Sequence, residues 1–364
     1  MRLILSLGAG RNVDTPAVTT ARYVTNGPPG KLRVTITAPA QGATLAAAST
    51  TVTGTTTAGS AVTVASADTT TGAPAAVTST TAAADGSFSA TVPVSFGSNA
   101  ITVSATAPGG RSTGYAQVTV TNEGGGTSVL DVADPTGDDN GPGTYQYPTA
   151  TNSDGSPVFV PGSFDLTRFQ VLSDGTFAYL RVTLRTLVPT FGVLDGAQLL
   201  DVYVHAPGAS ATSTAAAFAS RNYTIAPAGA WSQRVEVQGF ASPVWMNASG
   251  ASVGTAAALA VQADRTITVA LPEAQFGTPA SGWGFSVVLT GQDGFGTDQA
   301  RNFTTTAGGF TFGVCAPNGT APICSVNPST VPKAMDVITP ANVTQASELD
   351  PTLAPVVIQP VTVP

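Results

Sequence analysis

The residues best suited to chemistry lie in one segment, Asp134-Pro-Thr-Gly-Asp-Asp-Asn-Gly-Pro-Gly-Thr-Tyr-Gln-Tyr-Pro-Thr149. Its prolines and glycines interrupt any regular helix, which predicts an ordered loop. A bent backbone can bring side-chain and carbonyl oxygens together, and Ca²⁺ takes roughly six to eight oxygen ligands. We expect the carboxylates of Asp134, Asp138 and Asp139 and the amide of Asn140 to bind a structural calcium ion. Alternatively, these side chains only cap turns by hydrogen bonding to the backbone.

A second acidic loop, Asp293-Gly-Phe-Gly-Thr-Asp298, also combines carboxylates with glycines. Asp293 and Asp298 are expected to complete the calcium site, to form another one, or to hydrogen-bond sugar hydroxyls. The alternative is a glycine-rich turn at the end of a strand.

Sugar binding needs flat aromatic faces beside polar groups that bind hydroxyls. The candidates are Trp231, Trp245, Tyr145 and Tyr147, whereas Trp283 begins an apolar strand and is assigned to the core. The two candidate tryptophans lie in segments rich in Pro, Gly and Ala, which favours loops. Alternatively, these rings fill the core or the edge of the domain, and this alternative stays open.

Catalysis by this chain is not expected. Glycoside hydrolysis needs two positioned carboxylates beside a cleft. The four glutamates, Glu123, Glu236, Glu273 and Glu348, lie in no motif that suggests an acid/base pair. The single histidine, His205, has no nucleophile motif to form a triad with.

The composition describes a weakly charged protein of many short strands and turns. The 364 residues suffice for two or three domains and include 39 glycines and 27 prolines. Charged residues make up 10%, well below the usual quarter, but 42% are hydrophobic, so the chain can bury cores. The net charge is −7 with only two lysines, which excludes nucleic-acid binding. No apolar run is long enough to span a membrane.

The two cysteines, Cys315 and Cys324, flank a short segment whose Asn-Gly pair favours a tight turn. We expect a disulfide that contributes about 2–3 kcal/mol. It indicates a secreted or cell-surface, extracytoplasmic location. The alternative is two unrelated buried thiols; zinc is not expected, because no second pair of ligands lies nearby.

Alternation of apolar and polar residues predicts strands in two blocks of the chain. Residues 31–122 are predicted to form an antiparallel, immunoglobulin-like β-sandwich. Residues 128–350 are predicted to form a larger sandwich, with strands at 177–184, 199–205, 234–238, 266–271 and 283–289.

The segments outside these blocks are expected to connect or to extend them. The Gly-rich residues 123–127 predict a flexible hinge. Residues 1–30 are expected to be a linker or the remnant of an upstream catalytic domain. The Pro-rich residues 351–364 predict an extended, mobile tail.

Five motifs follow one another through the second block. They are Asp134-Pro-Thr-Gly-Asp-Asp-Asn-Gly-Pro-Gly-Thr-Tyr145, Gly162-Ser-Phe-Asp-Leu-Thr-Arg-Phe169, Asp201-Val-Tyr-Val-His205, Gly291-Gln-Asp-Gly-Phe-Gly296 and Met335-Asp-Val-Ile-Thr-Pro340. In order and spacing they resemble the C-terminal domain of glucodextranase and related bacterial α-glucan hydrolases of glycoside hydrolase family 15. The first block, with Asp85-Gly-Ser-Phe88, resembles bacterial immunoglobulin-like modules.

The resemblance implies a DOMON-like or jelly-roll-like β-sandwich of carbohydrate-binding type. It also implies that the family's catalytic α-helical barrel is missing from this chain. The expected function is a non-catalytic accessory segment of a secreted α-glucan-acting hydrolase that binds α-glucan or cell-wall polysaccharide. The alternative is a domain that docks on the missing barrel or anchors it to the cell surface without glycan affinity.

Overall fold

The structure, a computed structural model, describes residues 31–70, 72–110 and 112–364; the linker predicted at residues 1–30 lies outside them. The chain divides into two units. The first ends at Asn122 and the second comprises Glu123–Pro364 together with Ala46–Ala48. Among the described residues the regular structure is almost entirely β-strand, and no helix exceeds four residues. The predicted all-β class is confirmed.

Unit 1 is a sandwich of two sheets. One has the order β1 (Thr35–Ala38), β3 (Ser49–Thr55), β6 (Ser87–Pro93). The other has the order β2 (Ala43–Leu45), β8 (Thr113–Asn122), β7 (Gly97–Thr106), β4 (Ala61–Asp68), β5 (Pro74–Thr81). Alternation explains the core, because every second residue of β6 is buried. These residues, Phe88, Ala90 and Val92, join the valines of β4 and β7.

Unit 2 is a larger antiparallel sandwich. Its five-stranded sheet has the order β16 (Ala257–Val261), β17 (Thr266–Pro272), β11 (Phe177–Leu184), β10 (Leu166–Ser173), β9 (Thr127–Ala133). Its second sheet has the order β15 (Ala241–Asn247), β14 (Gln233–Gln238), β12 (Gln198–His205), β18 (Gly284–Gly291), β21 (Asp336–Val337). Both sheets contribute to one core, and the central strands β12 and β18 are buried along nearly their whole length.

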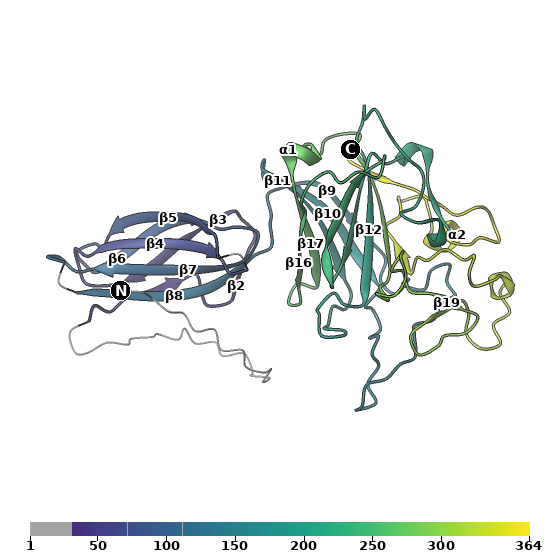
Figure 1. Ribbon diagram of the computed structural model, residues 1–364, viewed down its shortest axis with the longest axis horizontal. Helices are drawn as coiled ribbons and strands as arrows, with labels where there is room; N and C mark the ends of the chain where they lie inside the picture. Colours follow the sequence, from purple (N-terminus) through teal and green to yellow (C-terminus); the bar gives the residue numbers. More distant parts are fainter. Residues whose placement is uncertain (1–30, 71, 111) are drawn as a thin grey trace. The chain divides into compact units, whose positions relative to one another are not determined.

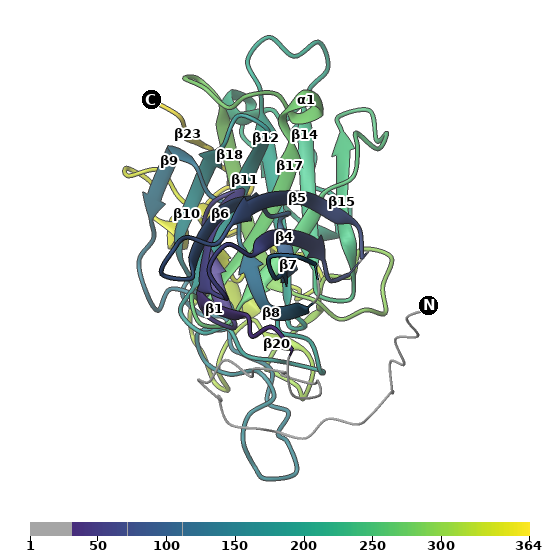
Figure 2. The same cartoon turned by 90° about the vertical axis from the view of Figure 1, so that its left-hand side faces the viewer.

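The C-terminal residues are part of unit 2, which corrects the prediction of a mobile tail. β22 (Val357–Ile358) pairs with β13 (Thr224–Ile225), and β23 (Val361–Thr362) pairs with β18. Figure 2 labels β23 beside β18. The physical reason is apolar burial, since Val356, Ile358, Val361 and Val363 are all buried.

The Gly-rich residues 123–127 are also anchored to unit 2. The Arg181 guanidinium donates hydrogen bonds to the carbonyls of Glu123 and Gly124, at 2.8 and 2.9 Å. β9 then begins at Thr127. The segment predicted to be a hinge is therefore bound to β11 through its backbone.

Long loops connect the strands of unit 2, as Figure 1 shows. They carry the short elements η1 (Ala219–Arg221), η2 (Pro227–Gly229), α1 (Glu273–Phe276), β19 (Phe303–Thr304), β20 (Phe312–Gly313), η3 (Pro322–Ser325) and α2 (Gln345–Glu348). The expected disulfide joins Cys315 and Cys324 within these loops. Within the described ranges, no helix has the length and apolar character needed to cross a membrane.

Candidate functional site

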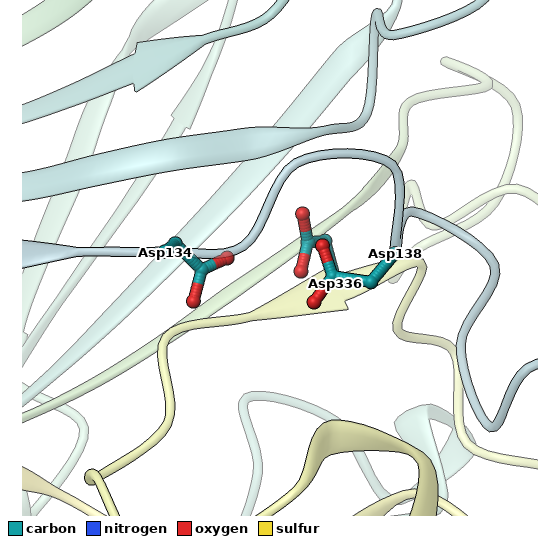
Figure 3. Close-up of side chains that lie close together, drawn as sticks. All are labelled: Asp134, Asp138 and Asp336. Atoms are coloured by element: carbon teal, nitrogen blue, oxygen red, sulfur yellow. The ribbon is translucent and has the colours of Figure 1, made fainter.

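Three carboxylates converge at one edge of unit 2. Asp134, Asp138 and Asp336 each offer an oxygen, and these oxygens all lie within 4.8 Å of one another. Figure 3 shows that two of the side chains come from the loop after β9 and the third from β21. Segments that are far apart in the sequence thus meet at one acidic cluster.

The cluster joins the two sheets of the sandwich. Asp134 directly follows β9, the edge strand of the five-stranded sheet, and its N–H donates to the Thr167 carbonyl at 3.0 Å. Asp336 begins β21, the last strand of the other sheet, and its Oδ2 accepts a hydrogen bond from the Leu166 N–H at 2.6 Å. The three carboxylates therefore lie where one edge of each sheet meets the other.

Glycines and one glutamine hold the loop in place. Gly141 has φ +59°, and a Cβ there would lie 2.3 Å from the Tyr145 ring, so only glycine fits. The Gln345 side chain donates to the Asp138 carbonyl and accepts from the Val337 N–H at 2.9 Å. Gln345 thereby connects the loop to β21.

A fourth carboxylate, Asp165, lies beside the cluster with 0% of its surface exposed. Its Oδ2 accepts from the Gly137 N–H at 2.8 Å and lies 3.5 Å from the Arg185 guanidinium. Its Oδ1 has no hydrogen-bond partner, and the same holds for the buried Asp134 Oδ2 and Asp138 Oδ1. Buried carboxylate oxygens normally have partners, so these three need an explanation.

The pKa values of these carboxylates are raised, which agrees with the oxygens among them that lack hydrogen-bond partners. Burial raises the pKa of Asp134 from 3.8 to about 8, and the charges of Asp138 and Asp165 add to this effect. Burial, followed by the charges of Asp134 and Asp138, raises the pKa of Asp336 well above its ordinary value. Burial and then the charge of Asp139 raise the pKa of Asp165 to about 6. The protein thus holds several carboxylates where negative charge is unfavourable unless a cation neutralises it.

Only part of the predicted ligand set meets in the structure. Asp134 and Asp138 belong to the cluster, whereas the Asp139 carboxylate accepts a hydrogen bond from the Tyr147 hydroxyl. The Asn140 carbonyl closes a turn by accepting the Gly143 and Tyr145 N–H groups.

The second acidic loop does not complete this cluster, contrary to one of the expectations. Asp293 Oδ1 accepts from the N–H groups of Phe295 and Gly296, at 3.0 and 3.4 Å, and so closes a turn in its own loop. Asp298 forms an ion pair with Lys333 at 3.0 Å inside the unit.

Sequence reasoning missed Asp336 and Asp165 as members of the site, although both lie in the family motifs. A signal for both was present, because each is a lone carboxylate in an otherwise apolar run, between Met335 and Val337 and between Phe164 and Leu166. Carboxylates are rarely fully buried without a partner.

Three of the four predicted sugar-binding rings are buried in unit 2, and the fourth, Tyr147, is partly buried. Trp231 is 6% exposed, and Trp245 and Tyr145 are each 2% exposed. Both indole N–H groups donate to oxygens within the unit, at 2.8 Å. Tyr147 packs edge-on against Phe164. A buried ring offers no face to a sugar, so the prediction that Trp231, Trp245 and Tyr145 form a platform is wrong, because tertiary packing covers residues that the sequence places in open loops. The assignment of Tyr147 stays a prediction.

Comparison with known proteins gives one match over most of unit 2. Residues 129–357 match the sequence model of a family described as the C-terminal, SLH-like binding module of glucodextranase. That description is of a binding module and not of a catalytic domain. No curated protein matches the chain.

Solved structures overlap with parts of the chain. One is an engineered protein, 30% identical, covering 26% of this chain and 21% of its own, with a TM-score of 0.20. Others are a Parabacteroides merdae β-glucuronidase (8% identical, covering 72% and 23%, TM-score 0.22) and a Bacteroides uniformis β-glucuronidase (8% identical, covering 74% and 24%, TM-score 0.19). The chain spans less than a quarter of the length of each of these proteins. At these TM-scores the overlaps carry no argument about function.

Proposed function

This chain belongs to the family of C-terminal, SLH-like binding modules of glucodextranase, and from this premise we propose that unit 2 is a non-catalytic carbohydrate-binding module. It serves a secreted α-glucan-acting hydrolase and binds α-glucan or cell-wall polysaccharide. The observation that carries the proposal is the family match, which covers both sheets of the sandwich from β9 to β22. The disulfide supports an extracytoplasmic location.

Affinity electrophoresis tests glycan binding directly. The full chain is run in native gels that contain soluble starch, dextran or pullulan, with calcium present, beside a gel without polysaccharide. We expect retardation in at least one polysaccharide gel relative to a protein that binds no glycan. Migration that is unchanged in all three gels contradicts binding of these α-glucans.

The second candidate is an anchor to the cell surface, which the SLH-like description of the family favours. Co-sedimentation with purified peptidoglycan or wall polymer separates it from α-glucan binding. Retention on wall polymer without retardation in α-glucan gels supports the anchor. A chain that binds neither material is left with the third role, docking to a catalytic domain.

We also propose that Asp134, Asp138 and Asp336 bind a structural calcium ion, with Asp165 as an additional negative charge. The supporting observation is that one buried carboxylate oxygen each of Asp134, Asp138 and Asp165 has no hydrogen-bond partner. All the donors are oxygens, which suits a hard cation. Because the cluster lies between edge strands of the two sheets, the ion stabilises their junction and the loop after β9. Chelation is expected to lower the melting temperature of the chain.

A further inference from the structure

A cavity of about 850 Å³ lies in unit 2, away from the aspartate cluster. Four phenylalanines line it: Phe191, Phe240, Phe295 and Phe310. They are 47%, 49%, 97% and 55% exposed, respectively. Only two other large hydrophobic side chains of unit 2, Val244 and Leu353, are comparably exposed among the residues that the structure describes. Exposed aromatic surface gathered around one cavity indicates a binding site.

Two of these rings pack against a buried aromatic ring. The buried Phe159 makes edge contacts with Phe191 and Phe310, with ring centroids 5.8 and 6.2 Å apart. The guanidinium of Arg301 lies over the Phe159 ring, 4.7 Å from its centroid. Phe191 has φ +55°, a backbone conformation that residues other than glycine rarely adopt. The protein thus maintains a strained backbone where it presents an exposed ring.

Phe295 is presented by an ordered turn. The Asp293 carboxylate accepts the N–H groups of Phe295 and Gly296, and Gly294 has φ +71°. The Phe295 ring packs against almost nothing, since 97% of it is exposed. Such a ring contributes little to the stability of the fold, and its face is free to contact a ligand at the cavity.

Polar groups lie among the rings. Gln238, Gln292, Asp293, Gln299 and Arg301 also line the cavity. The Gln292 amide donates to the Gln238 amide oxygen at 3.3 Å, which places two amide groups side by side.

Arg301 is 4% exposed and holds two backbone carbonyls at the cavity. Its two terminal nitrogens donate to the carbonyls of Phe310 and Gln292. Its buried Nε has no hydrogen-bond partner. The Nε is enclosed by protein atoms, so Arg301 acts at the cavity by fixing the Phe310 and Gln292 carbonyls and not by contacting a ligand through this atom.

We propose that this cavity is the glycan-binding subsite of the module and that it takes the pyranose rings of an uncharged glucan. The apolar faces of the sugar stack on Phe295 and Phe310, while its hydroxyls bond to the amides of Gln238 and Gln292. One carboxylate and one guanidinium line the cavity and offset each other, which favours a neutral ligand. The inference rests on the proposed carbohydrate binding and assigns its location.

Substitution of the two most exposed rings tests the assignment. Phe295→Ala and Phe310→Ala are compared with Tyr115→Ala, which removes an aromatic side chain of unit 1 that is 56% exposed. Binding of the glucan that retards the native chain is measured by affinity electrophoresis, and binding of an oligosaccharide derived from it by titration calorimetry. We expect each phenylalanine variant to bind about 10-fold more weakly, and the control to bind as the native chain does. Unchanged thermal melts confirm that the exposed substitutions leave the fold intact.

The outcomes distinguish failure of the subsite assignment from failure of the proposed carbohydrate binding. Native-like binding by both phenylalanine variants overturns the subsite and leaves carbohydrate binding by unit 2 standing. A native chain that no glucan retards overturns the subsite, and one that wall polymer also fails to retain overturns carbohydrate binding as well. If sedimentation shows that the native chain self-associates and that Phe295→Ala abolishes this association without changing glycan binding, the cavity is an interface between copies and the subsite is overturned.

Discussion

Replacing Asp134 by asparagine separates the effect of calcium from the effect of burying a charge. In the metal-free protein, the pKa of Asp134 is raised from 3.8 to about 8. The folded protein therefore holds a proton that the unfolded chain releases above pH 4, and its stability falls as the pH rises from about 4 to about 8. At pH 7 this penalty is about 4 kcal/mol, taking about 1.36 kcal/mol per pKa unit over the interval from 3.8 to 7.

An asparagine at this position carries no charge, so it avoids the penalty but is a poorer ligand. With chelator at pH 7, Asp134→Asn is expected to be more stable than the native chain, by up to about 4 kcal/mol. Calcium narrows this difference, because it stabilises only the native chain. A ligand at 100 times its dissociation constant adds about 2.7 kcal/mol. For a unit of this size, that corresponds to a rise in Tm of roughly 5–10 °C.

The assay is thermal unfolding of both chains at pH 7, with EGTA and with millimolar calcium. Asp154→Asn is the matched control, because Asp154 lies in an exposed turn where asparagine can still accept the Ser156 N–H at 2.9 Å. The native chain and the control should both gain stability from calcium, whereas Asp134→Asn should not. The reasoning is refuted if calcium leaves the native Tm unchanged, or if Asp134→Asn responds to calcium as the native chain does.

Three further predictions concern the interior of unit 2. Burial raises the pKa of Glu348 from 4.5 to about 7. The stability that the protonated Glu348 contributes is therefore complete below pH 4.5 and is lost as the pH rises through 7. Glu348→Gln keeps the oxygen that accepts the Gln359 N–H. In urea unfolding, this variant should be as stable as the native chain at pH 4 and about 3 kcal/mol more stable at pH 8. Identical pH profiles of the two chains would contradict this prediction. Arg221→Met removes the cation nearest to the buried Asp201 and Glu236 and leaves them only Arg234, 4.0 and 3.5 Å away, so it should lower the free energy of unfolding by up to about 3–5 kcal/mol. A loss below about 1 kcal/mol would show that Arg221 is dispensable. Reduction of the disulfide should lower the free energy of unfolding by about 2–3 kcal/mol, and a melt that is insensitive to reductant would argue against it.

Strand periodicity predicted the central strands of unit 2 well. The segment at 177–184 is β11, and 199–205 and 266–271 fall within β12 and β17. These strands carry an apolar pattern that is local in the sequence. β16, with the sequence Ala-Ala-Leu-Ala-Val, has no alternation and was not predicted. An edge strand depends on its neighbour for pairing, so its own residues need not encode it strongly.

Burial was harder to predict than secondary structure. Trp231 and Trp245 lie in segments whose composition favours open loops, yet both pack inside the unit. In contrast, Phe295 and Phe310 lie in glycine-rich loops and are exposed beside a cavity. The same kind of local sequence leads to opposite exposures, because coverage depends on segments that return from elsewhere in the chain.

By itself, the sequence determined the all-β class, the disulfide between Cys315 and Cys324 and an acidic loop beginning at Asp134. Each of these depends on residues close together in the chain, where spacing and side-chain type suffice. Tertiary structure alone decided that Asp336 joins Asp134 and Asp138, and that exposed phenylalanines rather than tryptophans line a cavity. These sites form between distant segments, and the packing of two sheets, rather than any local pattern, brings their atoms together.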